Sequence, residues 1–163
     1  FIVYGHNQME KETKEALIEN IQYRNKLAQI RGDSLSLSDA KETDLWIEGW
    51  FSVLFGKYKE AKEKLAVLKN LKEKKKDPSA LFGYNGLMGM VSLGEGEANK
   101  ALNFLNLANP NDIYIMYQKA LAFRAVGNRE EAEKILGNIA NLNFSSWEVA
   151  ILKNQAKTAL LRL

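Results

Sequence analysis

Apolar residues recur three and four positions apart along most of the chain, and this spacing places them on one face of an α-helix. No segment shows the sustained alternation of apolar and polar residues that is typical of a half-buried strand. The pattern therefore predicts eight helices and no sheet. Glycine, asparagine and aspartate mark their ends. The expected ranges are about 8–30, 38–56, 58–75, a fourth helix from Asp77-Pro78 onward, 97–108, 111–127, 129–140 and a last helix from Ser145.

Three of these helix pairs share one arrangement of small residues. A small residue in the first helix precedes a turn glycine by seven positions, and alanine follows in the first turns of the second helix. Small side chains let two helices approach closely, and glycine accepts the backbone angles that reverse the chain. The residues are Gly49, Gly56 and Ala61 in the first pair, Gly89, Gly96 and Ala101 in the second, and Ala120, Gly127 and Ala132 in the third.

The best-matching stretch, residues 127–136 with the sequence GNREEAEKIL, resembles the turn and second helix of the tetratricopeptide repeat (TPR) family. Residues 56–61 are similar to it, and residues 109–112 resemble the corner between repeats. The resemblance covers about residues 39–142 and implies an all-α, right-handed superhelical solenoid of antiparallel helix pairs. It predicts an N-terminal flanking helix in 1–37, three TPR-like helix pairs in 38–142 and a C-terminal capping helix in 143–163.

The family resemblance also implies a concave groove formed by the first helix of each pair. That surface carries tryptophan, tyrosine and leucine here, so a carboxylate clamp built from lysines and asparagines is not supported. An apolar, aromatic groove suits a hydrophobic or amphipathic partner segment. The predicted partner-binding residues are Trp46, Ile47, Trp50, Leu87, Met90, Tyr114, Tyr117, Gln118, Leu121 and Arg124.

A second interpretation of the same residues stays open. The first predicted helix offers apolar side chains of its own, among them Leu17, Ile21 and Leu27, and it could fill part of the groove. A large apolar surface is typical of either a binding site or a buried contact. The sequence does not choose between them.

Composition narrows the classes of partner. The formal net charge is +3 on a chain with 23 basic and 20 acidic residues, which gives no electrostatic footprint for nucleic acid. Cysteine is absent, so disulfides and thiol chemistry are excluded. We expect a protein or peptide partner, with no small-molecule substrate and no cofactor. Residues 1–4 are apolar and could be the tail of an upstream membrane anchor or of a preceding repeat, which leaves the compartment open.

Few residues suggest catalysis or metal binding. His6 is the only histidine and lies in a stretch expected to be solvated, so we predict no metal site. Glu130 and Glu131 fit the first turn of a helix, where carboxylates interact favourably with the helix dipole. The lysine run in 69–76 is predicted to be a solvated helix end, and the glycines in 83–89 recur at the spacing of close helix contacts. No set of acid, base and nucleophile emerges, so we predict no enzyme.

These observations predict a protein-interaction scaffold that binds a hydrophobic or amphipathic segment in its concave groove. The alternative is an accessory domain of a larger enzyme or of a membrane-anchored assembly. Both follow from a repeat architecture, which by itself specifies no partner.

Overall fold

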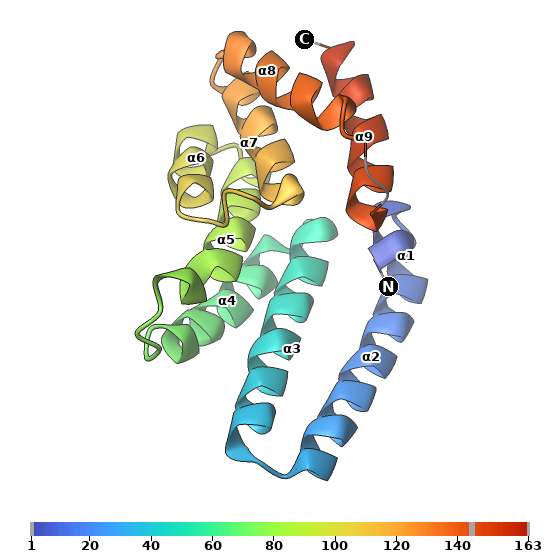
Figure 1. Ribbon diagram of the computed structural model, residues 1–163, viewed down its shortest axis with the longest axis vertical. Helices are drawn as coiled ribbons and strands as arrows, with labels where there is room; N and C mark the ends of the chain where they lie inside the picture. The colour runs from blue at the N-terminus through green and yellow to red at the C-terminus, as the bar shows by residue number, and fades with distance from the viewer. Residues whose placement is uncertain (1, 144–145, 163) are drawn as a thin grey trace. The chain divides into compact units, whose positions relative to one another are not determined.

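The computed structural model describes residues 2–143 and 146–162, and within them the chain forms helices and turns without any strand (Figure 1). The predicted all-helical fold class is confirmed. The chain divides into two compact units, residues 1–87 and 88–163, and helix α5 (Phe82–Gly94) contributes its first half to one unit and its second half to the other. Each unit is described by itself.

Unit 1 is built from two long helices, α2 and α3, with shorter elements packed around them. Helix α2 packs along α3, α3 packs along α4, and the short α1 contacts both α2 and α3. The fully buried leucines Leu65 and Leu68 of α4 and the buried Ile47 of α3 form much of the core between these helices. The elements are α1 (Ile2–His6), α2 (Glu10–Arg31), α3 (Ser34–Leu54), α4 (Tyr58–Lys72), the 3-10 helix η1 (Pro78–Leu81) and the first half of α5.

Unit 2 consists of antiparallel neighbours around two small apolar clusters. Helix α7 packs against α6 and α8, and α9 packs against both α7 and α8. Leu136, Ile139 and Leu152 are buried in one cluster, and Leu105 and Ile115 in the other. After the second half of α5, the helices are α6 (Ala98–Asn106), α7 (Ile113–Ala125), α8 (Arg129–Ala140) and α9 (Trp147–Leu160).

The three predicted turn glycines adopt one conformation. Gly56, Gly96 and Gly127 have φ values of 69°, 80° and 84°, in the left-handed region that other residues enter only with strain. In each turn the glycine N–H donates to the carbonyl three residues before it, and the next N–H donates to the carbonyl five residues before its own position. The same hydrogen-bonded turn therefore ends the first helix of each pair.

The small residues of the first helices are sites of close approach, as predicted. A Cβ atom on Gly89 would lie 2.5 Å from Cγ of Leu105 in α6, and one on Gly49 would lie 3.4 Å from Cδ2 of Leu65 in α4. The paired alanines, Ala61, Ala101 and Ala132, are fully buried. The side-chain size at these positions sets how near the paired helices lie.

Several boundaries differ from the predicted ones. Helix α3 begins one turn earlier than expected because the Asp33 carboxylate accepts a hydrogen bond from the Ser36 N–H at 2.7 Å and caps the helix there. Helix α4 ends at Lys72 rather than near residue 75. The predicted start of the last helix, Ser145, lies outside the described residues, and Ser146 caps α9. The short helix α1 was not predicted.

Candidate functional site

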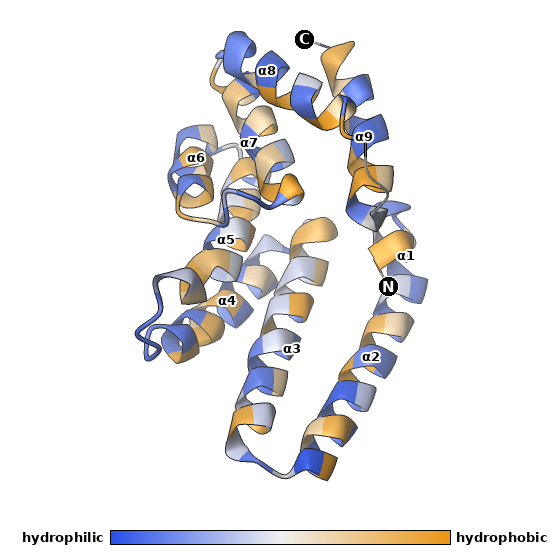
Figure 2. Ribbon diagram, viewed as in Figure 1, coloured by the Kyte–Doolittle hydropathy of each residue, from blue (hydrophilic) through white to orange (hydrophobic). Residues whose placement is uncertain are grey.

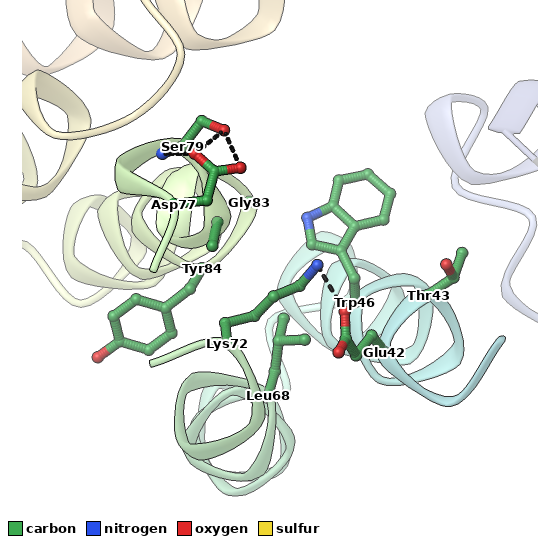
Figure 3. Close-up of a pocket in the computed structure, with 10 residues that line it drawn as sticks. Glu42, Thr43, Trp46, Leu68, Lys72, Asp77, Ser79, Gly83 and Tyr84 are labelled. Atoms are coloured by element: carbon green, nitrogen blue, oxygen red, sulfur yellow. Dashed lines mark hydrogen bonds and ion pairs between the residues drawn. The ribbon is translucent and has the colours of Figure 1, made fainter. Parts of the chain in front are cut away.

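A cavity of about 350 Å³ opens in unit 1 where α3, α4, η1 and the first turn of α5 meet (Figure 3). Its walls combine one exposed tryptophan with ionisable side chains and small residues. Four separate elements contribute, so the cavity depends on tertiary packing rather than on one local motif. The lining residues are Glu42, Thr43, Trp46, Leu68, Lys72, Asp77, Ser79, Ala80, Gly83 and Tyr84.

Trp46 projects from α3 toward the start of α5 and forms the apolar wall of the cavity (Figure 3). Its side chain leaves the residue 37% exposed, whereas Ile47 beside it is buried. The indole lies against Gly83: a Cβ atom there would be 2.9 Å from both Cδ1 and Nε1. The absence of a side chain at position 83 is therefore what gives the indole its place.

Glu42 lies one turn before Trp46 on α3 and carries the buried negative charge of the site. The Nζ atoms of Lys72 and Lys75 each lie 2.7 Å from the same carboxylate oxygen, Oε2. Burial alone would raise the pKa of Glu42. The hydrogen bonds and positive charges of the two lysines outweigh that effect and hold the pKa below its ordinary value. The carboxylate therefore stays ionised at neutral pH and acts as a structural anchor for the end of α4.

The opposite rim is fixed by a capping interaction at the start of η1. The Asp77 carboxylate accepts hydrogen bonds from the hydroxyl and the backbone N–H of Ser79, both at 2.8 Å. The hydroxyl bond first, and then the backbone bond, lower the pKa of Asp77. Pro78 occupies the first position of the helical turn, where no N–H donor is needed. The hydrogen bonds that cap this rim therefore join residues that are neighbours in the sequence.

The lysine run was predicted to be a solvated helix end. Lys75 is exposed but lies beyond the end of α4, and Lys72 is half-buried. Both bind Glu42, which lies on α3 and far from them in the sequence. The missed signal was a glutamate on the same helical face as Trp46, at i−4. A carboxylate at this position is buried beside the tryptophan, and a buried carboxylate needs a positively charged partner.

Trp50, the second predicted tryptophan of α3, is covered. Its indole and the His6 ring meet in an edge-to-face arrangement with ring centroids 6.2 Å apart, and a Cβ atom on Gly5 would lie 2.9 Å from the indole. His6 is therefore packed on α3 rather than solvated, which corrects the prediction, and burial lowers its pKa. The short helix α1 therefore covers the turns of α3 that follow Trp46.

The other predicted residues divide by unit. In unit 1, Ile47 and Leu87 are buried and contribute to the core. In unit 2, Tyr114 and Tyr117 are half-buried against the cluster of α8 and α9. Burial raises the pKa of both tyrosines. The remaining residues are Met90, Gln118 and Leu121, which are half-buried, and Arg124, which is exposed.

The cavity contains no arrangement that suggests catalysis. Its carboxylates are already bound, Glu42 by two lysines and Asp77 by a serine, and neither has the raised pKa of a general acid. Across residues 2–143 and 146–162, no three acidic or histidine side chains gather where a metal ion would need them. The cavity offers an aromatic surface beside fixed charges, which suits binding.

In the described part of the chain, no helix has the length and apolar character needed to cross a membrane. Comparison with known proteins gives no relative to set beside these observations: no protein-family model, no curated protein and no solved structure matches the chain.

Proposed function

We propose that the chain is a protein-interaction module in which Trp46 anchors an apolar segment of a partner. The observation that carries the proposal is the exposed indole at the edge of a cavity in unit 1. Tryptophan is enriched among the few residues that dominate protein interfaces, because it buries a large rigid surface at a low cost in conformational entropy.

The contrast between the two tryptophans of α3 supports this choice of anchor. Trp50 is covered by α1, so its surface is already used within the chain. Trp46 lies against Gly83, and its residue stays 37% exposed. The exposed part of the indole is available to a partner without any rearrangement of the core.

The chemistry around the indole defines the kind of segment that fits. Thr43, on the neighbouring turn, is exposed, while its hydroxyl donates to the Asp39 carbonyl at 2.7 Å. The charges beside the cavity are already paired, because Glu42 binds Lys72 and Lys75, and Lys75 also binds Asp39. We therefore expect an uncharged apolar side chain to enter, with polar partner groups at the rim. This is the peptide-recognition mode in which a few apolar anchors supply most of the affinity.

The repeated helix pairs support a TPR-like solenoid as the architecture of the module. The three turns share one hydrogen-bonded conformation, and the small residues at the pair contacts recur in register. Such arrays commonly use the first helices of their pairs as a binding face. Trp46 lies on a helix of that kind, α3.

The test uses peptides selected against the intact chain from a displayed library of short segments. We expect apolar or amphipathic peptides to be recovered, and Trp46→Ala to weaken their binding at least tenfold, equivalent to about 1.4 kcal/mol. Fluorescence polarisation with a labelled peptide measures the change. Circular dichroism and thermal unfolding establish that the variant is folded.

Val67→Ala is the matched control, because Val67 is an exposed apolar residue of α4 that does not line the cavity. Its variant should bind the selected peptides as the parent chain does. Recovery of no peptide, or equal binding by Trp46→Ala and the parent chain, would contradict the proposed function.

A further inference from the structure

Helix α2 carries an exposed apolar stripe that the rest of unit 1 leaves uncovered. Tyr23, Leu27 and Ile30 are 62%, 62% and 71% exposed. The face that α2 turns toward its neighbours is a different one, with Thr13, Leu17 and Ala28 buried. Apolar positions recur along α2 down to its C-terminal end (Figure 2). An exposed stripe of this kind on one helix marks a contact surface.

The stripe has the spacing of a coiled-coil seam. Ala16, Asn20, Tyr23, Leu27 and Ile30 follow one another at intervals of four, three, four and three residues. This 3.5-residue repeat keeps the positions on one seam when two helices wrap around each other. The stripe therefore suits a second helix lying almost parallel or antiparallel to α2.

Two charged residues flank the stripe and indicate which helix packs against it. Glu19 and Lys26 stand seven residues apart on the same edge of the seam, and both are exposed. Neither forms an ion pair within the part of the chain that the structure describes. In an antiparallel pair of identical helices, this edge of one helix meets the same edge of the other. Glu19 would then face Lys26 of the second copy, and the pairing occurs twice by symmetry.

In this antiparallel register, the residues that face each other across the seam also match in size and polarity. It sets the small Ala16 opposite Leu27 of the second copy. It also sets Asn20, whose amide oxygen accepts a hydrogen bond from Arg24 and whose NH2 group remains as a donor, opposite Tyr23. A parallel arrangement brings Lys26 beside Arg31 of the other helix, which is a like-charge pair, and its one opposite-charge pair would join Glu19 to Arg24. Arg24, on the other edge, is already bound to Asp44 of α3. Because Arg24 is already paired, the charge pattern favours the antiparallel orientation over the parallel one.

We infer that α2 is a self-association surface, on which a second copy of the chain docks antiparallel through Tyr23 and Leu27, with Glu19 facing Lys26 of the other copy. The surface lies on α2 and is separate from the cavity at Trp46. Partner binding and self-association are therefore independent properties, and the inference does not rest on the proposed function.

Sedimentation equilibrium of the intact chain over a range of concentrations tests the inference. We expect the average mass to rise from 18.4 kDa toward twice that value as concentration increases. Leu27→Glu should weaken association at least tenfold while circular dichroism shows the helix content unchanged. Val67→Glu places the same charge on an exposed apolar position of α4 and should associate as the parent chain does.

Charge exchange tests the orientation. Glu19→Lys and Lys26→Glu should each weaken self-association, because each sets like charges opposite one another at both ends of the pair. An equimolar mixture of the two variants should recover association, since both lysines of the first variant's edge then face both glutamates of the second variant's edge. A chain that carries both substitutions should associate alone.

A chain that stays monomeric at every concentration would overturn the inference and assign the stripe to a different partner. A mixture that associates no better than its components would overturn the antiparallel register. Trp46→Ala, which tests the proposed function, should leave the association constant unchanged, so the two proposals succeed or fail separately.

Discussion

The indole of Trp46 occupies the space that a side chain at Gly83 would fill. A Cβ atom at position 83 would approach its Cδ1 and Nε1 atoms to 2.9 Å, a distance that real Cβ contacts do not show. The two residues belong to α3 and α5, so the contact connects the two helices at the wall of the cavity (Figure 3). The orientation of the proposed anchor therefore depends on a glycine in another helix.

This relationship predicts the effect of Gly83→Ala. In a free helix, alanine would gain about 1 kcal/mol over glycine. We expect little or none of that gain here, because the added methyl group must displace the indole. In a two-dimensional ¹H–¹⁵N spectrum, the indole signal assigned to Trp46 should shift while those of the other two tryptophans stay in place. An unchanged Trp46 signal would contradict the contact.

The ion pairs of Glu42 should contribute to the free energy of unfolding in a pH-dependent way. Its pKa is lowered in the folded chain, so its ion pairs stabilise the fold above the ordinary value of 4.5 and are lost as the pH falls through the lower, folded-state pKa. Glu42→Gln should cost about 1–2 kcal/mol at neutral pH, since Lys72 and Lys75 remain partly exposed to water.

Urea unfolding at several pH values measures this contribution. The difference in unfolding free energy between the parent chain and Glu42→Gln should be constant near neutral pH and shrink below about pH 4.5. Glu63→Gln provides the control, because Glu63 is an exposed residue of α4 away from the cavity. A difference that grows with falling pH would show that the ion pairs do not hold Glu42 ionised.

The turns and pair contacts could be predicted from the sequence because they depend on nearby residues. A left-handed turn needs glycine at one position, and a close helix contact needs a small residue. The sequence alone therefore predicted Gly96 as a turn residue and Gly89 as a contact residue. Trp46, in contrast, was placed among the binding residues by the TPR resemblance, and its binding role stays a prediction. Residues that depend only on local geometry were thus the most predictable ones.

The features that could not be predicted from the sequence depend on contacts between segments far apart in the chain. Lys75 meets Glu42 across 33 positions in the chain, and no short motif records the pairing. Likewise, α1 is too short to form by itself, because an isolated helix of five residues is unstable in water. It exists by packing on α3. This packing half-buries His6, which was predicted to be solvated, and covers Trp50, whose burial the sequence left open.

The packing of α1 on α3 predicts the effect of Gly5→Leu. A Cβ atom at Gly5 would lie 2.6 Å from Cδ2 of Leu54, so a larger side chain must lift α1 from α3 and expose Trp50. Acrylamide quenching measures the exposure in a background of Trp46→Phe and Trp147→Phe, where Trp50 is the remaining tryptophan. We expect the quenching constant to rise about twofold or more, toward that of an exposed indole. Val3→Leu, at an exposed position of α1, should leave it unchanged.

Two glycines in helices of unit 2 predict opposite effects of one substitution. At Gly89 the added methyl group would lie 2.5 Å from Cγ of the fully buried Leu105 and 3.3 Å from the Ala101 carbonyl oxygen, so α5 and α6 must move apart. We expect Gly89→Ala to lower the unfolding free energy by about 1–3 kcal/mol, the usual cost of overpacking. At Gly137, in α8, no atom of the described residues lies within 4 Å of the new methyl group, apart from its chain neighbours and the backbone of its own helix.

Gly137→Ala should therefore raise the unfolding free energy by about 0.5–1 kcal/mol through helix propensity alone. Urea unfolding of both variants, followed by far-ultraviolet circular dichroism, gives the two values under the same conditions. Because the substitution is identical, the difference between them isolates the contact at Gly89 from the intrinsic preference of alanine for helices. Equal stabilisation by both would mean that α5 and α6 are not held as close as the paired Gly89 and Ala101 require.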